Sequence, residues 1–521
     1  MKIRKNLIKM LAYLLCFAML ATLTVFTVGA ETSGADTVDY TLITNEAELR
    51  AVYDNLEGNY KLANDITLTV DWAPIQGFKG IFDGNGFDIH DLYLEDVGTS
   101  NYARVGFFGT LESGAVVKNL AVHGTIKNDY WAKTYVGGIV GEMMTGSTVE
   151  NCFSDVDITF GILSHNAYVG GIVGVVFPGV TIKNCINEGD IAVDSDPSSA
   201  KRHWIGGIAG YVQGVEEGDT LIENCVNRGA LSVTKNCEAD TYIAGIAGNI
   251  SHDKGTVTIT RCVNFGAISG VTRYVAGIAG GHKYDLVDKG KVDISYCSNF
   301  GEITCTNGSG TNYVGGIFGR GVWATGSTVT NCYNAGKVSA PVKGVGAIAG
   351  DDLNVTCKNC VSVSVENVTG SGLFGLDEMG TVVEGCEVIG NNTTLTDVVT
   401  KLNGTLETAV FKLENGAIAQ TYHVFVASED TVLPPQSGGN NNDQQGGNND
   451  QQGGNNDQQG GNNNDQQGEN NDETNAPETK APETNALVDE EASGCKSVVS
   501  SALAVMLCIG ATGVMITRRK H

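Results

Sequence analysis

Apolar and glycine positions recur at a long, regular interval between residues 105 and 390. One landmark is a glycine-rich apolar core, first seen as VGGIVG at residues 136–141. The pattern returns in segments that begin at Val169, Ile205, Ile243, Val275, Val314 and Val345, and in a looser form at residues 370–375. Self-similarity at such an interval predicts a repeat protein in which each unit forms one structural repeat.

A second landmark follows each core: an apolar residue, two variable positions and then a cysteine. The eight cysteines are 26 to 40 residues apart: Cys152, Cys185, Cys225, Cys262, Cys297, Cys332, Cys360 and Cys386. Strict alternation would turn each cysteine away from the core, so a bend is required at the preceding residue, which is asparagine in five of the eight. Parallel side chains of adjacent repeats point the same way rather than at each other, so we expect reduced, small apolar core residues rather than disulfides.

Each unit holds three short β-like runs separated by Gly, Asn, Asp and Ser. They are too short and too rich in glycine and valine for helices. Short alternation with frequent turns also fits a sandwich or barrel. The return of the same residue types to the same point of each unit favours a solenoid, because they can then stack in ladders. The sequence therefore predicts an all-β parallel β-helix.

The open ends of such a solenoid need covers. At the N-terminal end, Asn45 and Glu48 form a capping box ahead of apolar residues at helical spacing, which predicts a short capping helix over residues 45–57. At the other end, residues 395–432 predict a C-terminal cap, with a short helix followed by strands through residues 422–425. We therefore divide this part of the chain into an N-terminal cap with first coils (31–104), repeats (105–394) and the C-terminal cap.

Both ends of the chain carry long apolar runs. A basic start, an apolar run and small residues before position 31 predict a signal peptide at 1–30; a membrane anchor is the alternative. The uncharged residues 498–517 are long enough to cross a bilayer, and Arg518, Arg519 and Lys520 follow them. Positive charge stays on the cytoplasmic side, so residues 494–521 predict a membrane anchor with a cytoplasmic C-terminus and an extracellular ectodomain.

Residues 433–493 have a different composition from the rest, rich in Asn, Gln, Gly and Asp and almost without large apolar residues. Such a segment cannot bury enough surface to offset its ordering entropy, so we expect a disordered spacer that holds the ectodomain away from the membrane. The formal charge of the whole chain is −26. The chain lacks the cluster of Lys and Arg residues that nucleic-acid binding needs, so nucleic-acid binding is not expected.

The motifs resemble a known family. Cores of the Gly-Gly-Ile-x-Gly type alternating with Asn-Cys-x-Asn-x-Gly segments, together with NYKLANDI at residues 59–66 and GIFDGNG at 80–86, are similar to the GLUG-repeat surface proteins of bacteria. The resemblance implies a right-handed parallel β-helix and an exposed, adhesion-like role. The tail, with GCKS at 494–497, resembles anchors of Gram-positive clostridial surface proteins. Residues 433–437 (LPPQS) depart from the sortase motif, which argues against covalent wall attachment.

Enzyme motifs are missing from the sequence. No histidine is followed by glutamate, no Gly-x-Ser-x-Gly elbow occurs, and the eight histidines lack metal-ligand spacing. The lone Cys-x-x-Cys at 357–360 has no second pair. We therefore expect a non-catalytic, cell-surface adhesin or interaction module that contacts a glycan, matrix or another surface protein and needs no cofactor. The alternative is a polysaccharide-active β-helix, a lyase or hydrolase.

One candidate contact surface is aromatic. An aromatic residue stands just before the glycine-rich core in six successive repeats: Tyr135, Tyr168, Trp204, Tyr242, Tyr274 and Tyr313. If the coils stack, the rings form a column. An outward column would offer a platform for sugar faces or a partner surface. The alternative is a structural ladder in which the rings pack against each other.

A second candidate is acidic. Asp155 and Asp157 follow Cys152 at the same offsets at which Glu188 and Asp190 follow Cys185. In neighbouring coils the four carboxylates would lie close together, which could bind Ca²⁺ or support acid–base chemistry. Arg228 takes the next equivalent place, so a plain solvent-facing charge ladder explains the same residues.

Overall fold

The computed structural model describes residues 38–425 with short gaps. The gaps are residues 97–101, 128–132, 164, 196–200, 215–216, 236–240, 282–289, 309, 322–325, 342, 352–354, 364–368, 370–371, 377–381, 391–392 and 423. The predicted signal peptide, spacer and membrane anchor lie outside the described residues. Within them, no helix is long and apolar enough to cross a membrane.

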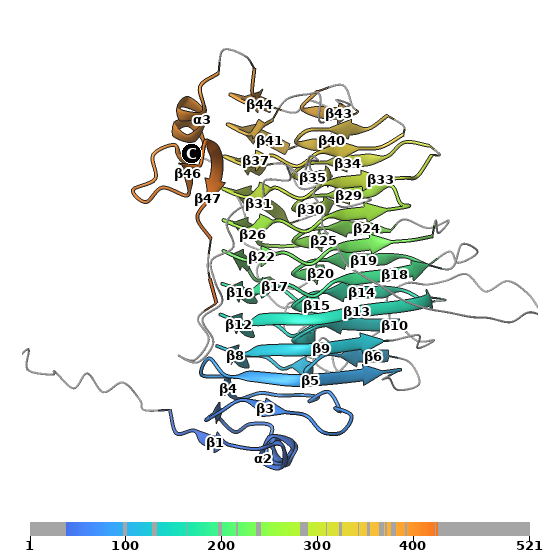
Figure 1. Cartoon of the computed structure of the whole chain (residues 1–521), viewed down its shortest axis with the longest axis vertical. Coiled ribbons are helices and arrows are strands. Elements are labelled where there is room, and N and C mark those ends of the chain that lie inside the picture. The colour runs from blue at the N-terminus through green and yellow to red at the C-terminus, as the bar shows by residue number, and fades with distance from the viewer. Residues whose placement is uncertain are drawn as a thin grey trace, which may run out of the picture. The chain divides into compact units, whose positions relative to one another are not determined.

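The described chain is built from coils stacked along one axis, and each full coil contributes to four parallel sheets in turn (Figure 1). We name these sheets D, C, A and B in the order in which the chain visits them. The strands of sheet D are β6 (Tyr102–Val105), β10 (Lys133–Gly137), β14 (Ala167–Gly170), β19 (His203–Gly206), β24 (Tyr242–Ala244), β29 (Tyr274–Ala276), β34 (Tyr313–Gly315) and β39 (Val345–Gly346). The strands of sheet C are β7 (Phe108–Leu111), β11 (Val140–Met143), β15 (Val173–Val176), β20 (Ala209–Gly214), β25 (Ala247–His252), β30 (Ala279–Gly281), β35 (Phe318–Arg320), β40 (Ala349–Asp351) and β43 (Phe374–Leu376).

Sheets A and B complete each coil. The strands of sheet A are β1 (Thr41–Ile43), β2 (Tyr60–Leu62), β4 (Ile81–Asp83), β8 (Val116–Lys118), β12 (Thr148–Glu150), β16 (Thr181–Lys183), β21 (Thr220–Glu223), β26 (Thr256–Thr260), β31 (Lys291–Ser295), β36 (Ser327–Thr330), β41 (Val355–Lys358) and β44 (Val382–Glu384). The strands of sheet B are β3 (Ile66–Thr67), β5 (Asp88–Glu95), β9 (Ala121–Lys127), β13 (Phe153–Leu163), β17 (Ile186–Asn187), β18 (Ile191–Ser195), β22 (Val226–Asn227), β23 (Leu231–Val233), β27 (Val263–Asn264), β28 (Ile268–Gly270), β32 (Ser298–Asn299), β33 (Ile303–Cys305), β37 (Tyr333–Asn334), β38 (Val338–Ser339), β42 (Val361–Ser362) and β45 (Glu387–Val388).

The expected all-β solenoid is present, and its register follows the sequence repeat. Every pairing between these coils is parallel, and equivalent positions face each other, as Val149 faces Ile182 and Ile182 faces Ile222 in sheet A. The inward side chains form one continuous apolar core through the stack. Equivalent residues therefore form columns along the axis, as a solenoid requires. The hand of the superhelix stays a prediction.

The number of strands in each repeat differs from the expectation of three runs. The glycine-rich core splits into two strands that belong to different sheets, as β10 and β11 do at Gly138 and Ile139. Glycine is needed at this bend because a Cβ on Gly137 would lie 2.1 Å from the carbonyl oxygen of Val140. The two sheets thus approach more closely than side chains would allow.

The cysteines occupy the positions that the sequence predicts. All eight ladder cysteines are free, and all but Cys386 are buried. The residue before each described ladder cysteine has a left-handed backbone, with φ of 54° at Asn151 and 55° at Asn184. This bend turns the thiol inward, where the Sγ of Cys185 lies 3.2 Å from the carbonyl oxygen of Lys183. The predicted bend and the core-facing position of the ladder are confirmed for the seven buried cysteines, and their reduced state stays a prediction.

The N-terminal cap begins with α2 (Glu46–Arg50), continued by a 3-10 turn η1 (Ala51–Asp54). The side chain of Asn45 accepts the backbone N–H of Glu48, and Glu48 in turn accepts the backbone N–H of Thr44 at 2.7 Å. The predicted capping helix is therefore present, and Leu49 and Val52 bury against the first coils.

The C-terminal segment contains α3 (Leu395–Asn403) and an antiparallel hairpin of β46 (Phe411–Glu414) and β47 (Ala417–Gln420). The hairpin precedes residues 422–425, where strands were expected. Helix α3 and the hairpin pack beside the last coils, on outward residues of sheet B that include Tyr333 and Val361 (Figure 1). From β47 the chain descends along the coils toward the N-terminal end (Figure 1). We call the described residues Thr421, Tyr422, Val424 and Phe425 the strap.

Candidate functional site

The six predicted aromatic residues do form a column. Their strands pair in register, so that Tyr168 faces Trp204 and Trp204 faces Tyr242. The rings of Tyr168 and Trp204 stack with centroids 4.4 Å apart, and those of Tyr242 and Tyr274 with centroids 4.3 Å apart. Sequence reasoning therefore found a real structural column.

The column is not the open platform that one interpretation required. Tyr135, Tyr168, Trp204, Tyr242 and Tyr274 are all buried, and only Tyr313 is half-buried. They form a separate apolar cluster with Val175, against which Tyr211 of sheet C also packs. Buried rings that contact each other match the alternative of a structural ladder, because sugar faces cannot reach them.

The four predicted carboxylates lie in adjacent coils, as the repeat implied: Asp155 and Asp157 are in β13, and Glu188 and Asp190 lie in the turn between β17 and β18. Their contacts are local. Asp157 accepts the backbone N–H of Asp190 at 2.9 Å, and Asp190 accepts that of Ala230 at 2.7 Å. Each carboxylate thus satisfies a backbone donor of the next coil.

The other two carboxylates pair with cations rather than with each other. Glu188 lies 2.5 Å from the guanidinium of Arg228. Asp155 lies 3.2 Å from the ring of His123. Across the described ranges, no group of three or more His, Cys, Asp or Glu side chains is arranged to hold a metal ion. The Ca²⁺ interpretation of Asp155, Asp157, Glu188 and Asp190 is therefore not supported, and their contacts are those of a charge ladder.

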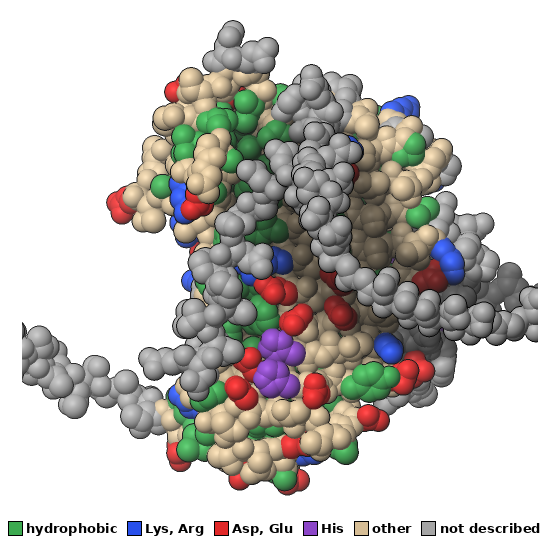
Figure 2. Space-filling view, in the orientation of Figure 1, with side chains coloured by type: hydrophobic (Ala, Val, Ile, Leu, Met, Phe, Trp, Pro, Cys, Tyr) green, Lys and Arg blue, Asp and Glu red, His purple; other side chains and the backbone are tan. Residues whose placement is uncertain are grey.

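His123 belongs to a small charged cluster that sequence reasoning missed. Its Nε2 lies 3.3 Å from Asp88, its Nδ1 lies 3.2 Å from Asp155, and its ring stacks on His90. Burial disfavours the charged ring, but the two carboxylates outweigh it and raise the pKa of His123 to about 9. Figure 2 shows histidines beside acidic side chains on this face of the molecule. The cluster holds a cationic imidazole at neutral pH.

The strap lies along outward residues of sheet B. Tyr422 contacts the ring of Phe265 edge-on, with centroids 5.4 Å apart, and stands 5.6 Å from the guanidinium of Arg228. The ring centroids of Phe425 and Phe153 are 5.7 Å apart. Gln420, at the end of β47, hydrogen-bonds the hydroxyl of Ser298. The short segment therefore crosses several coils.

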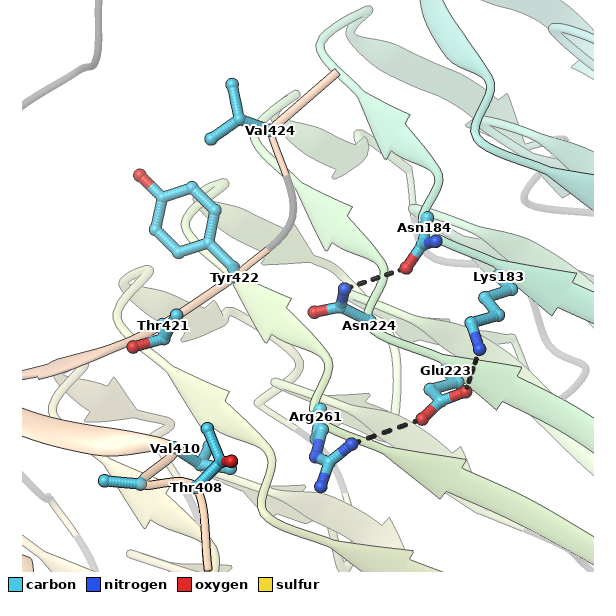
Figure 3. Close-up of a pocket in the computed structure, with 11 residues that line it drawn as sticks. Lys183, Asn184, Glu223, Asn224, Arg261, Thr408, Val410, Thr421, Tyr422 and Val424 are labelled. Atoms are coloured by element: carbon cyan, nitrogen blue, oxygen red, sulfur yellow. Dashed lines mark hydrogen bonds and ion pairs between the residues drawn. The ribbon is translucent and has the colours of Figure 1, made fainter. Parts of the chain in front are cut away.

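A pocket of about 590 Å³ opens between the C-terminal segment and the coils (Figure 3). The coils contribute the ends of β16 and β21 and the residues that follow β16, β21 and β26. The lining is Lys183, Asn184, Glu223, Asn224, Arg261, Thr408, Ala409, Val410, Thr421, Tyr422 and Val424. Its volume falls within the range of small-molecule sites.

The coil side of the pocket is polar and carries charges of both signs. Glu223 pairs with Lys183 at 3.0 Å and with Arg261 at 3.4 Å. Beside this triad, the amide nitrogen of Asn224 donates to the side-chain oxygen of Asn184 at 2.8 Å. Figure 3 shows the remaining side-chain oxygen of Asn224 directed toward the strap. The facing wall supplies two threonine hydroxyls, an aromatic ring and two valines, so the pocket combines donors, acceptors and apolar surface.

Sequence reasoning did not find this pocket. The sequence predicts a capping strand at Tyr422, and the cluster around Glu223 carries no motif. One signal was present: Arg261 stands before a ladder cysteine, at the position where most repeats have asparagine.

Comparison with known proteins adds little to this picture. No family model matches the chain, and no curated protein matches it. Among solved structures, a putative immunoglobulin A1 protease from Bacteroides ovatus aligns with 18% identity and a TM-score of 0.40, over 73% of this chain and 92% of that chain. At that level of similarity the neighbour assigns no activity.

Proposed function

We propose that the chain is a surface-anchored, non-catalytic binding module that holds a glycan in the pocket beneath the strap. The observation that carries the proposal is the composition of this pocket, which is open and lined by amides, hydroxyls, a charged triad and the ring of Tyr422. Side chains that both donate and accept match the paired hydroxyls of a sugar. A nearby aromatic ring matches the apolar face of the sugar.

The proposed location rests on the ends of the sequence. A signal peptide at residues 1–30 would export the chain, and residues 498–517 would hold it in the membrane. The spacer between the coils and the anchor would hold the pocket away from the membrane, where it could contact extracellular polysaccharides. The resemblance to GLUG-repeat surface proteins supports the same placement.

Binding is favoured over the enzymatic alternative by the contacts of the carboxylates. Asp157 and Asp190 accept backbone hydrogen bonds of the following coil, and Glu188 pairs with Arg228. Glu223, in the pocket, pairs with two cations at once. A carboxylate whose oxygens already hold such partners is poorly placed to exchange a proton with a substrate.

A glycan array tests the proposal with the full chain purified in detergent. Replacing both Thr408 and Thr421 by valine removes two pocket hydroxyls while nearly preserving shape. We expect about a tenfold or greater loss of affinity, because each lost hydrogen bond to a sugar hydroxyl weakens binding. Thr159→Val, an exposed threonine of β13 outside the pocket, is the matched control and should bind normally. Unchanged binding by the double variant, or no glycan bound by the wild type, would refute the proposal.

A further inference from the structure

Arg261 occupies a backbone position that suits asparagine. Its φ is 56°, in the left-handed region that L-residues other than Asn, Asp and Gly rarely adopt. The equivalent residues of the other coils include Asn119, Asn151, Asn184, Asn224, Asn331 and Asn359, all with φ between 53° and 56°. Arg261 therefore departs from a local preference for asparagine that most of the column follows.

The substitution also interrupts a hydrogen-bonded amide column. Asn151 donates to Asn119 at 2.7 Å, and Asn224 donates to Asn184 at 2.8 Å. In the next coil the side chain is a guanidinium, so the amide column does not continue past Asn224. An asparagine at position 261 would fit both the backbone and the column.

Tyr296, in the following coil, shares the unusual φ of 54° but has a packing partner that accounts for it. It is half-buried against the apolar cluster formed by α3, the hairpin and the last coils. Arg261 has no comparable packing: its side chain is 41% exposed, and its ion pair with Glu223 is long at 3.4 Å. A residue that adopts an unfavourable backbone conformation without a compensating packing contact is a candidate functional residue.

We infer that Arg261 makes the strap pocket selective for acidic glycans, whose carboxylate or sulfate it binds. This inference rests on the proposed glycan-binding function. Lys183 and Arg261 give the triad one net positive charge against Glu223, within a chain whose formal charge is −26. Glu223 faces only Nη1 of Arg261. The planar guanidinium carries further N–H donors, which suit the paired oxygens of a carboxylate or sulfate.

An acidic peptide is the competing ligand class, and the local topology disfavours it. Peptides commonly bind by adding a strand to a free sheet edge. The pocket strands lie in the middle of sheet A, where β21 pairs with β16 on one side and β26 on the other. Their backbone hydrogen bonds are thus already made within the sheet. The pocket offers side-chain amides and hydroxyls instead, which match sugar hydroxyls.

The variant Arg261→Asn tests the inference in the full chain purified in detergent. The probes are 3′-sialyllactose against lactose, and oligogalacturonate against its carboxyl-reduced form. We expect the wild type to bind at least one acidic probe tenfold or more tightly than its neutral counterpart, and R261N to lose this preference. The thermal midpoint of R261N should equal or exceed that of the wild type, because asparagine suits the left-handed position. Tyr296→Asn, in the same column but outside the pocket, should keep the preference.

The outcomes distinguish a failure of the role of Arg261 from a failure of the proposed glycan-binding function. Glycan binding without an acidic preference, or with a preference that survives in R261N, overturns the role of Arg261 and leaves the pocket function standing. Absence of any glycan binding overturns both. Equal competition by poly-glutamate would replace the acidic glycan with an acidic peptide. A lowered thermal midpoint in R261N would assign Arg261 to structure and overturn the inference.

Discussion

The residue before each ladder cysteine decides which way the thiol points. An extended residue there would place Cys152 outside the core, whereas the left-handed Asn151 turns it inward. Asparagine tolerates this conformation because its short amide can bond locally, and here the amide also bonds the neighbouring coil. A local backbone preference and a contact between coils therefore favour the same residue.

Replacing Asn151 separates these two contributions. Asn151→Ala should destabilise the protein by about 2 kcal/mol, because alanine is strained in the left-handed region and cannot donate to Asn119. Asn151→Gly should recover about 1 kcal/mol of this loss, since glycine adopts the conformation freely but also lacks the amide. Urea unfolding followed by circular dichroism measures both. Equal losses in the two variants would contradict a role for the backbone conformation.

The charged cluster at His123 gives the fold a pH dependence. The folded-state pKa of about 9 lies above the ordinary value of 6.5, so the stabilisation is complete below pH 6.5 and is lost as pH rises through 9. For a shift of this size we expect the free energy of unfolding to fall by about 2 to 3 kcal/mol between pH 6.5 and 9.5. His123→Gln should flatten that decline. Urea titrations at the two pH values measure it, and equal declines in both proteins would count against the assignment.

At the scale of elements, the strap lies on outward residues of sheet B and forms part of one wall of the pocket, facing the ends of the sheet A strands β16 and β21. It is held by few contacts, chiefly Tyr422 on Phe265 and Phe425 on Phe153. Phe425 is buried against Ala121, Phe153, Ile186 and Val226, whereas its neighbour Val424 is 47% exposed. The ring of Phe425 is thus the anchor of the distal end.

Phe425→Ala should release the strap without unfolding the coils. We expect amide hydrogen exchange of residues 421–425 to speed up about tenfold or more, because local opening depends on this buried ring. The far-ultraviolet circular dichroism should stay unchanged. Val424→Ala, which removes an exposed side chain, is the control and should exchange like the wild type. Equal protection in both variants would show that other contacts hold the strap.

The strap also explains which parts of the molecule the sequence could and could not predict. The coils were predictable because each residue type returns to one place in the unit, so that a column such as Cys185, Cys225 and Cys262 is visible in the sequence. The pocket was not predictable, because it depends on Tyr422 contacting Arg228 and Phe265. Tyr422 belongs to a segment that occurs once in the chain, so no periodicity indicates which coil it contacts. The aromatic column shows a further limit: its existence followed from periodicity, but its burial depends on how sheets C and D fold together.

For the whole molecule, stability is distributed along the axis. Each coil contacts its neighbours through four sheets, and the apolar core runs through all of them. In such a one-dimensional stack, coils contribute nearly independent increments. The strap is different, because Gln420 fixes its start at the coil of Ser298 and Phe425 fixes its end at the coil of Phe153. Its length must therefore match the number of coils between these two contacts.

Deleting whole coils tests this last property. Removing residues 185–224 joins Asn184 to Cys225, and removing residues 120–151 joins Asn119 to Cys152, so both junctions keep an asparagine before a cysteine. Both proteins should keep their circular dichroism and lose on the order of a few kcal/mol of stability. Only the first deletion shortens the span of the strap, by about 4.8 Å. Phe425 would then overshoot Phe153 toward Ala121 and lose its aromatic partner, so proteolysis at residues 421–425 should accelerate most in that variant, because the second deletion removes only Ala121 from the contacts of Phe425. Similar cleavage in both proteins would show that the strap does not depend on the coil count.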